Sequence, residues 1–261
     1  MIEINGLKIN KAEPDRPNGR PALLFIHGSG GGAWNWDNYL EFYSSLGYTA
    51  YAVNLRGHYG SKTVPDFGRI SFYDHLTDLR EVIRKLDNPV LFGHSMGGLL
   101  VQKLAESETV PAAVLIAPAP PKGIWVVSSV DHLVRAFAHG KEIINEQALR
   151  PDPEEAFRTT LNRLPPEQQL AVYEKGWSQS GKLLSELILH GVPVDPEKVK
   201  TKMRVIVGTE DRQTPPRVAR RVAERYGADY QEYNGFAHVL IIEPGWDWIA
   251  KETAEWLDKR L

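Results

Sequence analysis

Short, almost wholly apolar runs alternate along the chain with segments of helical pattern. Runs of this kind are typical of parallel strands that helices cover on both faces. They occupy residues 22–26, 48–53, 90–92, 112–116 and 203–207, and residues 230–233 are a sixth candidate. The predicted helices occupy residues 36–46, 72–86, 96–107, 215–226 and 244–257. Thr214 is expected to cap the helix that Pro215 begins. The alternation predicts an α/β fold with a doubly wound, mostly parallel central sheet.

Two stretches depart from this alternation. Near the N-terminus, apolar positions on both sides of Asn5-Gly6 predict a β-hairpin, because Asn-Gly is the strongest short hairpin signal. Between residues 118 and 202, prolines and glycines interrupt helical stretches, and the α/β pattern resumes afterwards. We therefore expect residues 118–202 to form an inserted helical cap, or lid, on an α/β core made of residues 1–117 and 203–261.

Composition narrows the classes of protein that the chain can belong to. Its 261 residues include 31 Lys and Arg and 33 Asp and Glu. This balance gives no excess of positive charge of the kind that binds nucleic acid or an anionic membrane. The absence of cysteine excludes disulfides, thiolate nucleophiles and cysteine-based metal sites. The first ten residues lack the pattern of a secretory signal, and no apolar stretch reaches the roughly 20 residues of a membrane helix. We therefore expect a cytoplasmic protein.

The sequence GHSMGG at residues 93–98 contains a candidate nucleophile. It places Ser95 in a G-x-S-x-G motif between a predicted strand and a predicted helix. A serine in this context sits on a sharp, strained turn that exposes its hydroxyl above the sheet. Glycine is expected at 93 and 97 because a β-carbon there would collide with the neighbouring helix and strand. The alternative is a turn that only connects the strand to the helix.

A glycine-rich loop at residues 27–34 follows the first apolar run. Its four glycines allow backbone N–H groups to approach a bound group closely. A phosphate cradle is one use of such a loop, but no Lys-Ser/Thr pair follows and no acidic residue is placed for a dinucleotide. An oxyanion hole fits better, with the N–H groups of Ser29 and Met96 as donors. His27 is expected to hold the loop in place and not to act as a base.

A serine nucleophile requires a base, and the base requires an orienting carboxylate. Glu210 and Asp211 both follow the run at 203–207, at the sheet edge where active sites of such folds lie. His238 follows the last predicted strand, among small and apolar residues. The residues themselves leave both carboxylates open, and the order Ser, acid, His makes His238 the candidate base for Ser95.

Five motifs taken together resemble the α/β-hydrolase fold family. They are HGSGGGAW at 27–34, NLRGHYGS at 54–61, GHSMGG at 93–98, GTEDRQTP at 208–215 and FAHVLIIEP at 236–244. They follow the family's order, and the resemblance covers nearly the whole chain. It implies Ser95 as nucleophile, Asp211 as acid and His238 as base, with an oxyanion donor at Ser29. Glu210 lies off the family's pattern.

The chain departs from that family's pattern at two positions outside the triad. The family usually has Asp where this chain has Asn54, and often Gly where it has Tyr59. These departures bear on the geometry of the local loop and not on the chemistry. The serine at position 95 argues against haloalkane dehalogenases and epoxide hydrolases, which carry an aspartate there.

The triad and the resemblance imply a carboxylesterase-like serine hydrolase. It would cleave short-to-medium acyl esters or lactones through an acyl-enzyme on Ser95. Candidate substrate contacts are Gly28, Trp34, Trp125 and Trp177. No cofactor is expected, and no H-E-x-x-H or similar cluster implies a metal.

Other functions share the same triad. They include C–C bond hydrolases, perhydrolases, aminopeptidases and hydroxynitrile lyases. A C–C hydrolase would place basic residues beside the nucleophile, and Arg56 is the nearest candidate in sequence, although it resembles part of a structural turn. A non-catalytic small-molecule receptor is the alternative from a different class. A small molecule is the expected partner, neither nucleic acid nor membrane is, and a homodimer is compatible with the sequence.

Overall fold

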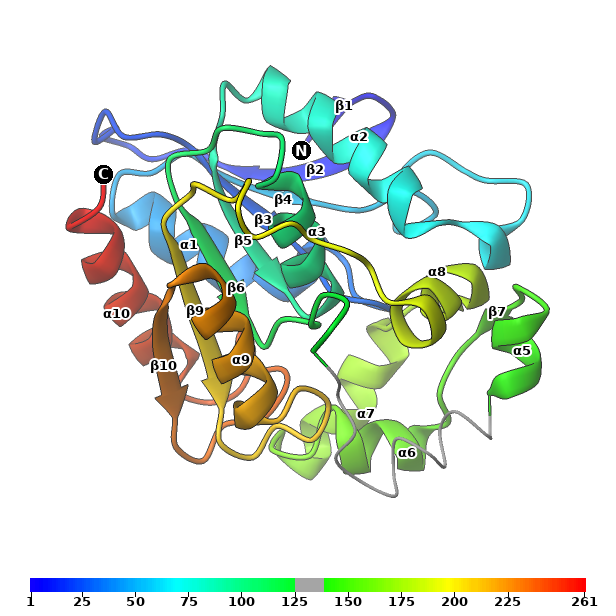
Figure 1. Cartoon of the computed structure of the whole chain (residues 1–261). Coiled ribbons are helices and arrows are strands. Elements are labelled where there is room, and N and C mark those ends of the chain that lie inside the picture. Colours follow the sequence, from blue (N-terminus) through cyan, green and yellow to red (C-terminus); the bar gives the residue numbers. More distant parts are fainter. Residues whose placement is uncertain (125–138) are drawn as a thin grey trace.

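An eight-stranded sheet forms the centre of the computed structural model, which describes residues 1–124 and 139–261 (Figure 1). The strands are β1 (Ile2–Ile4), β2 (Leu7–Ala12), β3 (Leu23–Ile26), β4 (Ala50–Val53), β5 (Val90–His94), β6 (Ala113–Ile116), β9 (Met203–Gly208) and β10 (Asp229–Tyr233). Their order in the sheet is β1-β2-β4-β3-β5-β6-β9-β10. From β4 to β10 every neighbouring pair is parallel, so the carboxyl ends of these strands meet along one edge. The predicted fold class is confirmed.

The first two strands form the hairpin that Asn5-Gly6 predicts. Ile4 pairs with Leu7 across the turn, and Asn5 and Gly6 have φ values of 51° and 74°. Positive φ at both central residues is what a two-residue hairpin turn of type I′ requires. Because β2 also pairs antiparallel with β4, the hairpin extends the parallel sheet at one edge.

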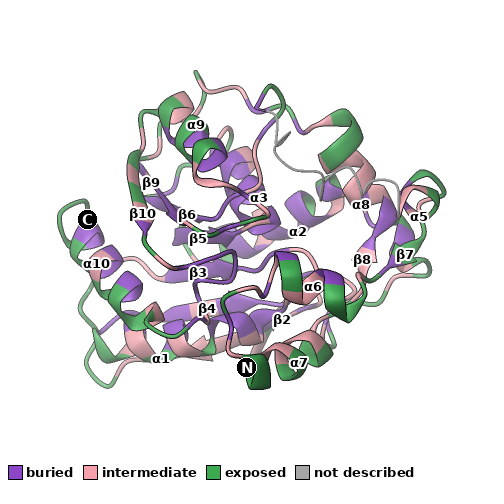
Figure 2. Cartoon of the chain, turned by 90° about the horizontal axis from the view of Figure 1, so that it is seen from below, coloured by how far each residue is buried: buried purple, intermediate pink, exposed green. Residues whose placement is uncertain are grey.

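Helices cover both faces of the sheet (Figure 1). On one face lie α1 (Asp37–Ser45) and α10 (Trp246–Asp258), and on the other lie α2 (Phe72–Lys85), α3 (Met96–Leu104) and α9 (Pro216–Tyr226). Leu23 and Phe25 of β3 belong to the first core, whereas Leu24 and Ile26 belong to the second. Side chains alternate across a strand, so a strand buried on both faces is a continuous apolar run. Figure 2 shows the inner strands β3, β5 and β6 as buried. Of the described helices, none has the length and apolar character to cross a membrane.

Residues 118–202 leave the sheet between β6 and β9, which pair directly with each other. We call these residues the inserted segment. Its described elements are α5 (Gly140–Ile144), β7 (Ala148–Leu149), α6 (Pro153–Thr159), α7 (Pro166–Lys175), β8 (Gln179–Ser180), α8 (Gly181–Ser185) and a π-helical turn (Glu186–His190). These elements gather beyond the carboxyl ends of the strands (Figure 1). A hydrogen bond of 2.8 Å from the Lys122 N–H to the Val192 carbonyl closes the segment near its base.

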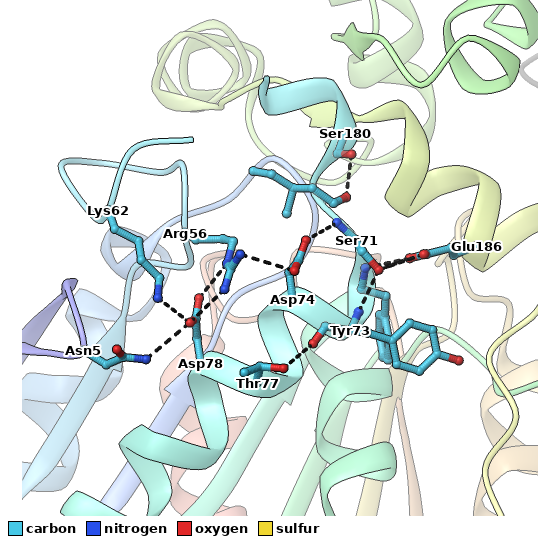
Figure 3. Close-up of polar contacts among 12 residues, drawn as sticks. Asn5, Arg56, Lys62, Ser71, Tyr73, Asp74, Thr77, Asp78, Ser180 and Glu186 are labelled. Atoms are coloured by element: carbon cyan, nitrogen blue, oxygen red, sulfur yellow. Dashed lines mark hydrogen bonds and ion pairs between the residues drawn. The ribbon is translucent and has the colours of Figure 1, made fainter. Parts of the chain in front are cut away.

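Polar contacts fasten the inserted segment to the start of α2 (Figure 3). The Glu186 carboxylate accepts two hydrogen bonds, one from the Phe72 N–H and one from the Ser71 hydroxyl, and each is 2.7 Å long. The Ser180 hydroxyl lies 2.7 Å from the Ile70 carbonyl oxygen. A carboxylate at this position is favourable because the first N–H groups of a helix are free and its dipole is positive there. The inserted segment thus supplies part of the cap of a core helix.

A buried carboxylate on α2 connects this helix to two further parts of the core (Figure 3). Asp78, with 1% of its surface exposed, accepts a hydrogen bond of 2.7 Å from Arg56 Nε and one of 3.3 Å from Asn5 Nδ2. The Lys62 ammonium lies 2.5 Å from the same carboxylate. Asp78 therefore joins the N-terminal hairpin and the loop after β4 to α2.

One helix boundary differs from the sequence prediction. Helix α9 begins at Pro216 with Pro215 in the capping position, one residue later than expected. The Thr214 N–H donates to the Asp211 carboxylate over 2.8 Å, so Thr214 is part of the preceding loop. The expectation that Thr214 caps this helix was wrong because Thr214 lies one residue before the capping position, which Pro215 occupies.

Replacing Asp78 by alanine removes the shared partner of Arg56 and Lys62 and leaves Arg56 with Asp74 alone, at 3.3 Å. We expect Asp78→Ala to lower the free energy of unfolding by about 1.5–3 kcal/mol, the usual contribution of hydrogen bonds to a charged group, because the two cations that remain are partly exposed. Urea unfolding followed by tryptophan fluorescence measures this loss. Asp15→Ala removes an exposed carboxylate and should change stability by less than about 0.5 kcal/mol. An Asp78→Ala protein as stable as the Asp15→Ala control would contradict the expectation.

Candidate active site

Ser95 lies on a strained turn between β5 and α3. Its backbone has φ 55° and ψ −118°, a left-handed conformation that residues with a β-carbon rarely adopt. A β-carbon on Gly93 would lie 2.3 Å from the Gly97 carbonyl oxygen, and one on Gly97 would lie 2.3 Å from the Ile26 carbonyl oxygen. These contacts are too close for any side chain, so both glycines are required as predicted. The turn is the strand–serine–helix junction that the motif indicates.

The structure brings Ser95, His238 and Asp211 together although they are far apart in sequence. The Ser95 hydroxyl lies 3.0 Å from His238 Nε2, and His238 Nδ1 lies 2.9 Å from Asp211 Oδ2. A carboxylate can only accept, so the Nδ1 proton points to Asp211 and Nε2 is free to accept from the hydroxyl. The three side chains come from the carboxyl ends of β5, β9 and β10. This geometry is that of a nucleophile, a base and an orienting acid.

The loop after β9 distinguishes Asp211 from Glu210. Asp211 Oδ1 accepts the N–H groups of Gln213 and Thr214, at 2.7 and 2.8 Å, and the carboxylate is buried. Glu210 is exposed, and its carboxylate lies 3.6 Å from Arg163. The two acids that the sequence left open thus face different surroundings, and only Asp211 contacts the imidazole.

The glycine-rich loop passes directly beside the serine. A β-carbon on Gly28 would lie 2.9 Å from the Ser95 Cβ. Within the described part of the chain, neither the Ser29 N–H nor the Met96 N–H donates a hydrogen bond, and both residues line the cavity described below. Met96 is the first residue of α3, where N–H groups have no partner within the helix. Both groups are therefore available to a bound oxygen.

His27 holds the glycine-rich loop in place through hydrogen bonds at both ring nitrogens. Its Nδ1 lies 2.8 Å from the Gly28 carbonyl, and its Nε2 accepts the Leu55 N–H over 3.2 Å. Burial lowers the pKa of His27 to about 3, so the ring is neutral at ordinary pH. Asn54 acts on the same loop by accepting the Ala33 N–H over 2.7 Å. Asparagine at this position therefore holds the loop through its amide oxygen.

Two residues that support the histidine were assigned no role from the sequence. His94 lies beside Ser95, and its Nε2 is 2.8 Å from the His238 carbonyl, to which it donates. Burial lowers the pKa of His94 to about 3, so it remains a neutral donor. Glu243 accepts the Ala237 N–H over 2.8 Å, at the residue just before His238. The only sequence signal was their place inside the two motifs, since neither residue type indicates such a bond by itself.

A cavity of about 570 Å³ lies beside Ser95 and His238. The carboxyl-edge loops and the inserted segment both line it. Most lining side chains are apolar, among them Ile124, Leu149, Leu161, Val172, Leu184 and Leu187. Of the candidate substrate contacts, Gly28, Trp34 and Trp177 line the cavity, and Trp125 lies outside the described residues. Over residues 1–124 and 139–261, no group of three or more His, Asp or Glu side chains could hold a metal ion.

The buried Glu243 carboxyl makes stability depend on pH. Burial raises its pKa to about 7 from a usual value of 4.5. Between these values the folded protein retains a proton that the unfolded chain releases, so the free energy of unfolding falls as pH rises through this window. At about 1.4 kcal/mol per pKa unit, the full cost above pH 7 is about 3 kcal/mol at most.

Glu243→Gln keeps an oxygen that can accept the Ala237 N–H but cannot ionise. We expect this variant to be more stable than the parent by about 1–3 kcal/mol at pH 8 and nearly equal to it at pH 5. Urea unfolding at pH 5, 6, 7 and 8 gives the two profiles. Glu255→Gln changes an exposed carboxylate and should follow the parent. If the Glu243→Gln profile keeps the parent's slope, the carboxyl does not titrate in this window.

Comparison with known proteins gives partial sequence matches and whole-chain structural matches. Human Protein ABHD8 is 36% identical over 77 residues, which are 29% of this chain and 18% of that protein. The match thus spans less than a fifth of that relative's length. The crystal structure of Paleococcus ferrophilus monoacylglycerol lipase has a TM-score of 0.75 at 24% identity and covers 98% of this chain and 99% of that one. A thermophilic esterase from Thermogutta terrifontis has a TM-score of 0.71 at 18% identity, with 97% and 93% covered. At these identities the structural likeness shows the fold.

The family comparison covers most of the chain. The model described as "Alpha/beta hydrolase family" matches residues 23–252. That range includes the strained serine turn, the acid loop and the histidine loop, and it confirms the resemblance indicated by the five motifs. The chain belongs to the α/β hydrolase family.

Proposed function

We propose that this protein is a serine hydrolase that cleaves carboxylic esters through an acyl-enzyme on Ser95. The observation that carries the proposal is the hydrogen-bonded relay from Ser95 through His238 to Asp211 beside a largely apolar cavity. A hydroxyl held on a base is what nucleophilic attack on a carbonyl carbon requires. The family membership of the chain supports the same class of chemistry.

The relay supports acylation followed by hydrolysis. Ser95 Oγ attacks the ester carbonyl carbon while its proton moves to His238 Nε2. The bond from that carbon to the alcohol oxygen breaks, and His238 gives the proton to the departing alcohol. A water molecule, deprotonated by His238, then attacks the acyl carbon and releases the acid, and Ser95 regains its proton. Asp211 orients the imidazole and stabilises its cation without taking up the proton.

The N–H groups of Ser29 and Met96 are the donors we assign to the oxyanion of each tetrahedral intermediate. Both line the cavity beside the nucleophile, and neither has another acceptor among the described residues. The positive end of the α3 dipole adds to the stabilisation at Met96. Losing one such donor typically costs about 100- to 1000-fold in turnover.

The cavity favours a short-to-medium acyl ester or a lactone as the substrate. Its volume of about 570 Å³ lies within the range of small-molecule sites, and its apolar lining suits an acyl chain. The inserted segment supplies much of that lining, so we assign it the part of a lid over the α/β core. The structurally similar proteins named a monoacylglycerol lipase and an esterase support the ester class.

The position of Arg56 weighs against a C–C bond hydrolase. Such an enzyme needs a basic group beside the nucleophile, and Arg56 was the candidate. Arg56 Nε instead lies 2.7 Å from the buried Asp78 carboxylate, and Arg56 is not among the described residues that line the cavity. That observation removes the basic candidate that the sequence offered, and the described lysine and arginine side chains that do line the cavity are Lys122 and Arg150.

Ser95→Ala is the direct test of the nucleophile. We expect kcat on p-nitrophenyl butyrate to fall by about 10⁴-fold or more, because removing a triad serine abolishes the covalent route. A fluorophosphonate probe should label the parent protein and not this variant. Ser107→Ala, which removes an exposed hydroxyl, should keep both properties. A panel of p-nitrophenyl esters of graded length beside lactones then defines the substrate, and turnover confined to long-chain lipids would contradict the acyl preference.

Two adjacent acids provide a matched test of the third triad member. Asp211→Asn keeps the size of the side chain but loses the charge that holds the imidazole, and we expect kcat to fall by about 10⁴-fold. Glu210→Gln changes the neighbouring exposed acid and should keep kcat within about twofold of the parent. Equal losses in the two variants would show that the carboxylate contact to His238 does not drive the reaction.

A further inference from the structure

The inserted segment makes a direct backbone contact with the glycine-rich loop. The Trp177 N–H donates to the Gly30 carbonyl over 2.7 Å. Within the loop, the Gly31 N–H donates to the Gly28 carbonyl over 3.1 Å and closes a turn whose central residues are Ser29 and Gly30. One bond of this turn is thus internal, and the other comes from the inserted segment. The N–H that we assign to the oxyanion belongs to a residue inside this turn.

Tyr59 holds both sides of that contact. It comes from the core loop after β4, and its hydroxyl donates to the Lys175 carbonyl in the inserted segment. Its ring centroid lies 5.6 Å from that of Trp177. The same ring covers the glycine-rich loop, because a β-carbon on Gly32 would lie 2.4 Å from Tyr59 Cε2. A single side chain therefore touches the loop and the segment that bonds to it.

The backbone at Tyr59 shows that this placement has a cost. Its φ of 42° is in the left-handed region, which is unfavourable for a residue with a β-carbon. Such conformations persist where the surrounding structure holds them in place.

A third contact joins the inserted segment to the core at the same place. The Lys175 ammonium lies 5.6 Å from the Trp34 ring centroid. Gly30, Trp34 and Trp177 all line the cavity, so the junction is part of its wall.

We propose that Tyr59 is a positioning residue that keeps residues 175–177 against Gly30 and thereby sets the Ser29 N–H for the oxyanion. The inference rests on the proposed function. According to this proposal, the Ser29 N–H is correctly placed for the oxyanion only when the inserted segment is docked on the glycine-rich loop. A substrate bound under the docked segment then has both oxyanion donors in position. Tyr59 acts through Trp177 and Gly30 and does not itself contact the reacting atoms.

Tyr59→Phe tests this role, because it removes the hydroxyl that bonds to Lys175 and keeps the ring. We expect kcat per active site, counted by fluorophosphonate titration, to fall about tenfold, less than the roughly 100- to 1000-fold of a lost donor. The inhibition constant of an alkyl trifluoromethyl ketone, whose Ser95 adduct places an oxyanion in the hole, should rise by a similar factor. KM for the ester should stay within about threefold, because the substrate pocket is unchanged.

Tyr73→Phe is the matched control, since Tyr73 is a half-exposed tyrosine on α2. It should leave turnover, inhibition and KM as in the parent. Hydrogen exchange at the Trp177 amide gives a readout without catalysis: Tyr59→Phe should speed it and Tyr73→Phe should not. A purely structural tyrosine would change stability and the titrated fraction but leave kcat per titrated site unaltered.

The outcomes separate this inference from the function on which it rests. A parent protein with neither ester turnover nor fluorophosphonate labelling overturns the proposed function and the positioning role together. An active parent whose Tyr59→Phe variant keeps kcat per site and ketone inhibition overturns the positioning role alone, whatever the exchange at Trp177 shows. Parallel losses in turnover and in ketone binding, with faster exchange, support the coupling.

Discussion

The left-handed turn at Ser95 is the constraint on which the rest of the site depends. A residue with a β-carbon in such a conformation costs about 1–3 kcal/mol, and it persists only where its surroundings hold it. Here the holding contacts are backbone against backbone, at Gly93 and Gly97. The turn sends the serine hydroxyl above the sheet edge and begins α3 at Met96. The loops that carry Asp211 and His238 then meet a serine hydroxyl whose position is already set.

Buried polar atoms hold those loops in place. His27 braces the glycine-rich loop, His94 donates to the carbonyl of His238, and Glu243 accepts the N–H just before it. Burial keeps both histidines neutral, so each ring has one N–H that donates and one nitrogen that can accept. A polar group buried with a partner fixes a direction that apolar packing does not. The glycine-rich loop and the loop that carries His238 thus owe their geometry to side chains outside the relay of Ser95, His238 and Asp211.

The sequence predicts the strands, helices and motifs that depend on a local pattern of residues. It does not predict contacts between residues that are far apart along the chain. Runs such as residues 22–26 indicate buried strands because both faces of β3 are covered, and the motif around Ser95 is local by nature. The contact from Trp177 to Gly30 joins residues with no shared periodicity, so no pattern indicates it. Thr214 has the residue type of a helix cap, but its N–H binds a carboxylate three residues earlier and Pro215 occupies the capping position.

The hydrogen bond from Lys122 to Val192 also bears on how such a fold can diversify. This bond brings the two ends of the inserted segment together, and β6 and β9 pair directly with each other below it. The entropy of closing a loop grows only slowly with its length, so chain between these ends can be lengthened, shortened or exchanged at little thermodynamic expense. The core strands would keep their pairing while new chain reshaped the chamber above them, and that new chain would have to supply the contact that Trp177 makes with the glycine-rich loop. Residues 122 and 192 are natural splice points for chimeras that graft one enzyme's selectivity onto another's reactive machinery.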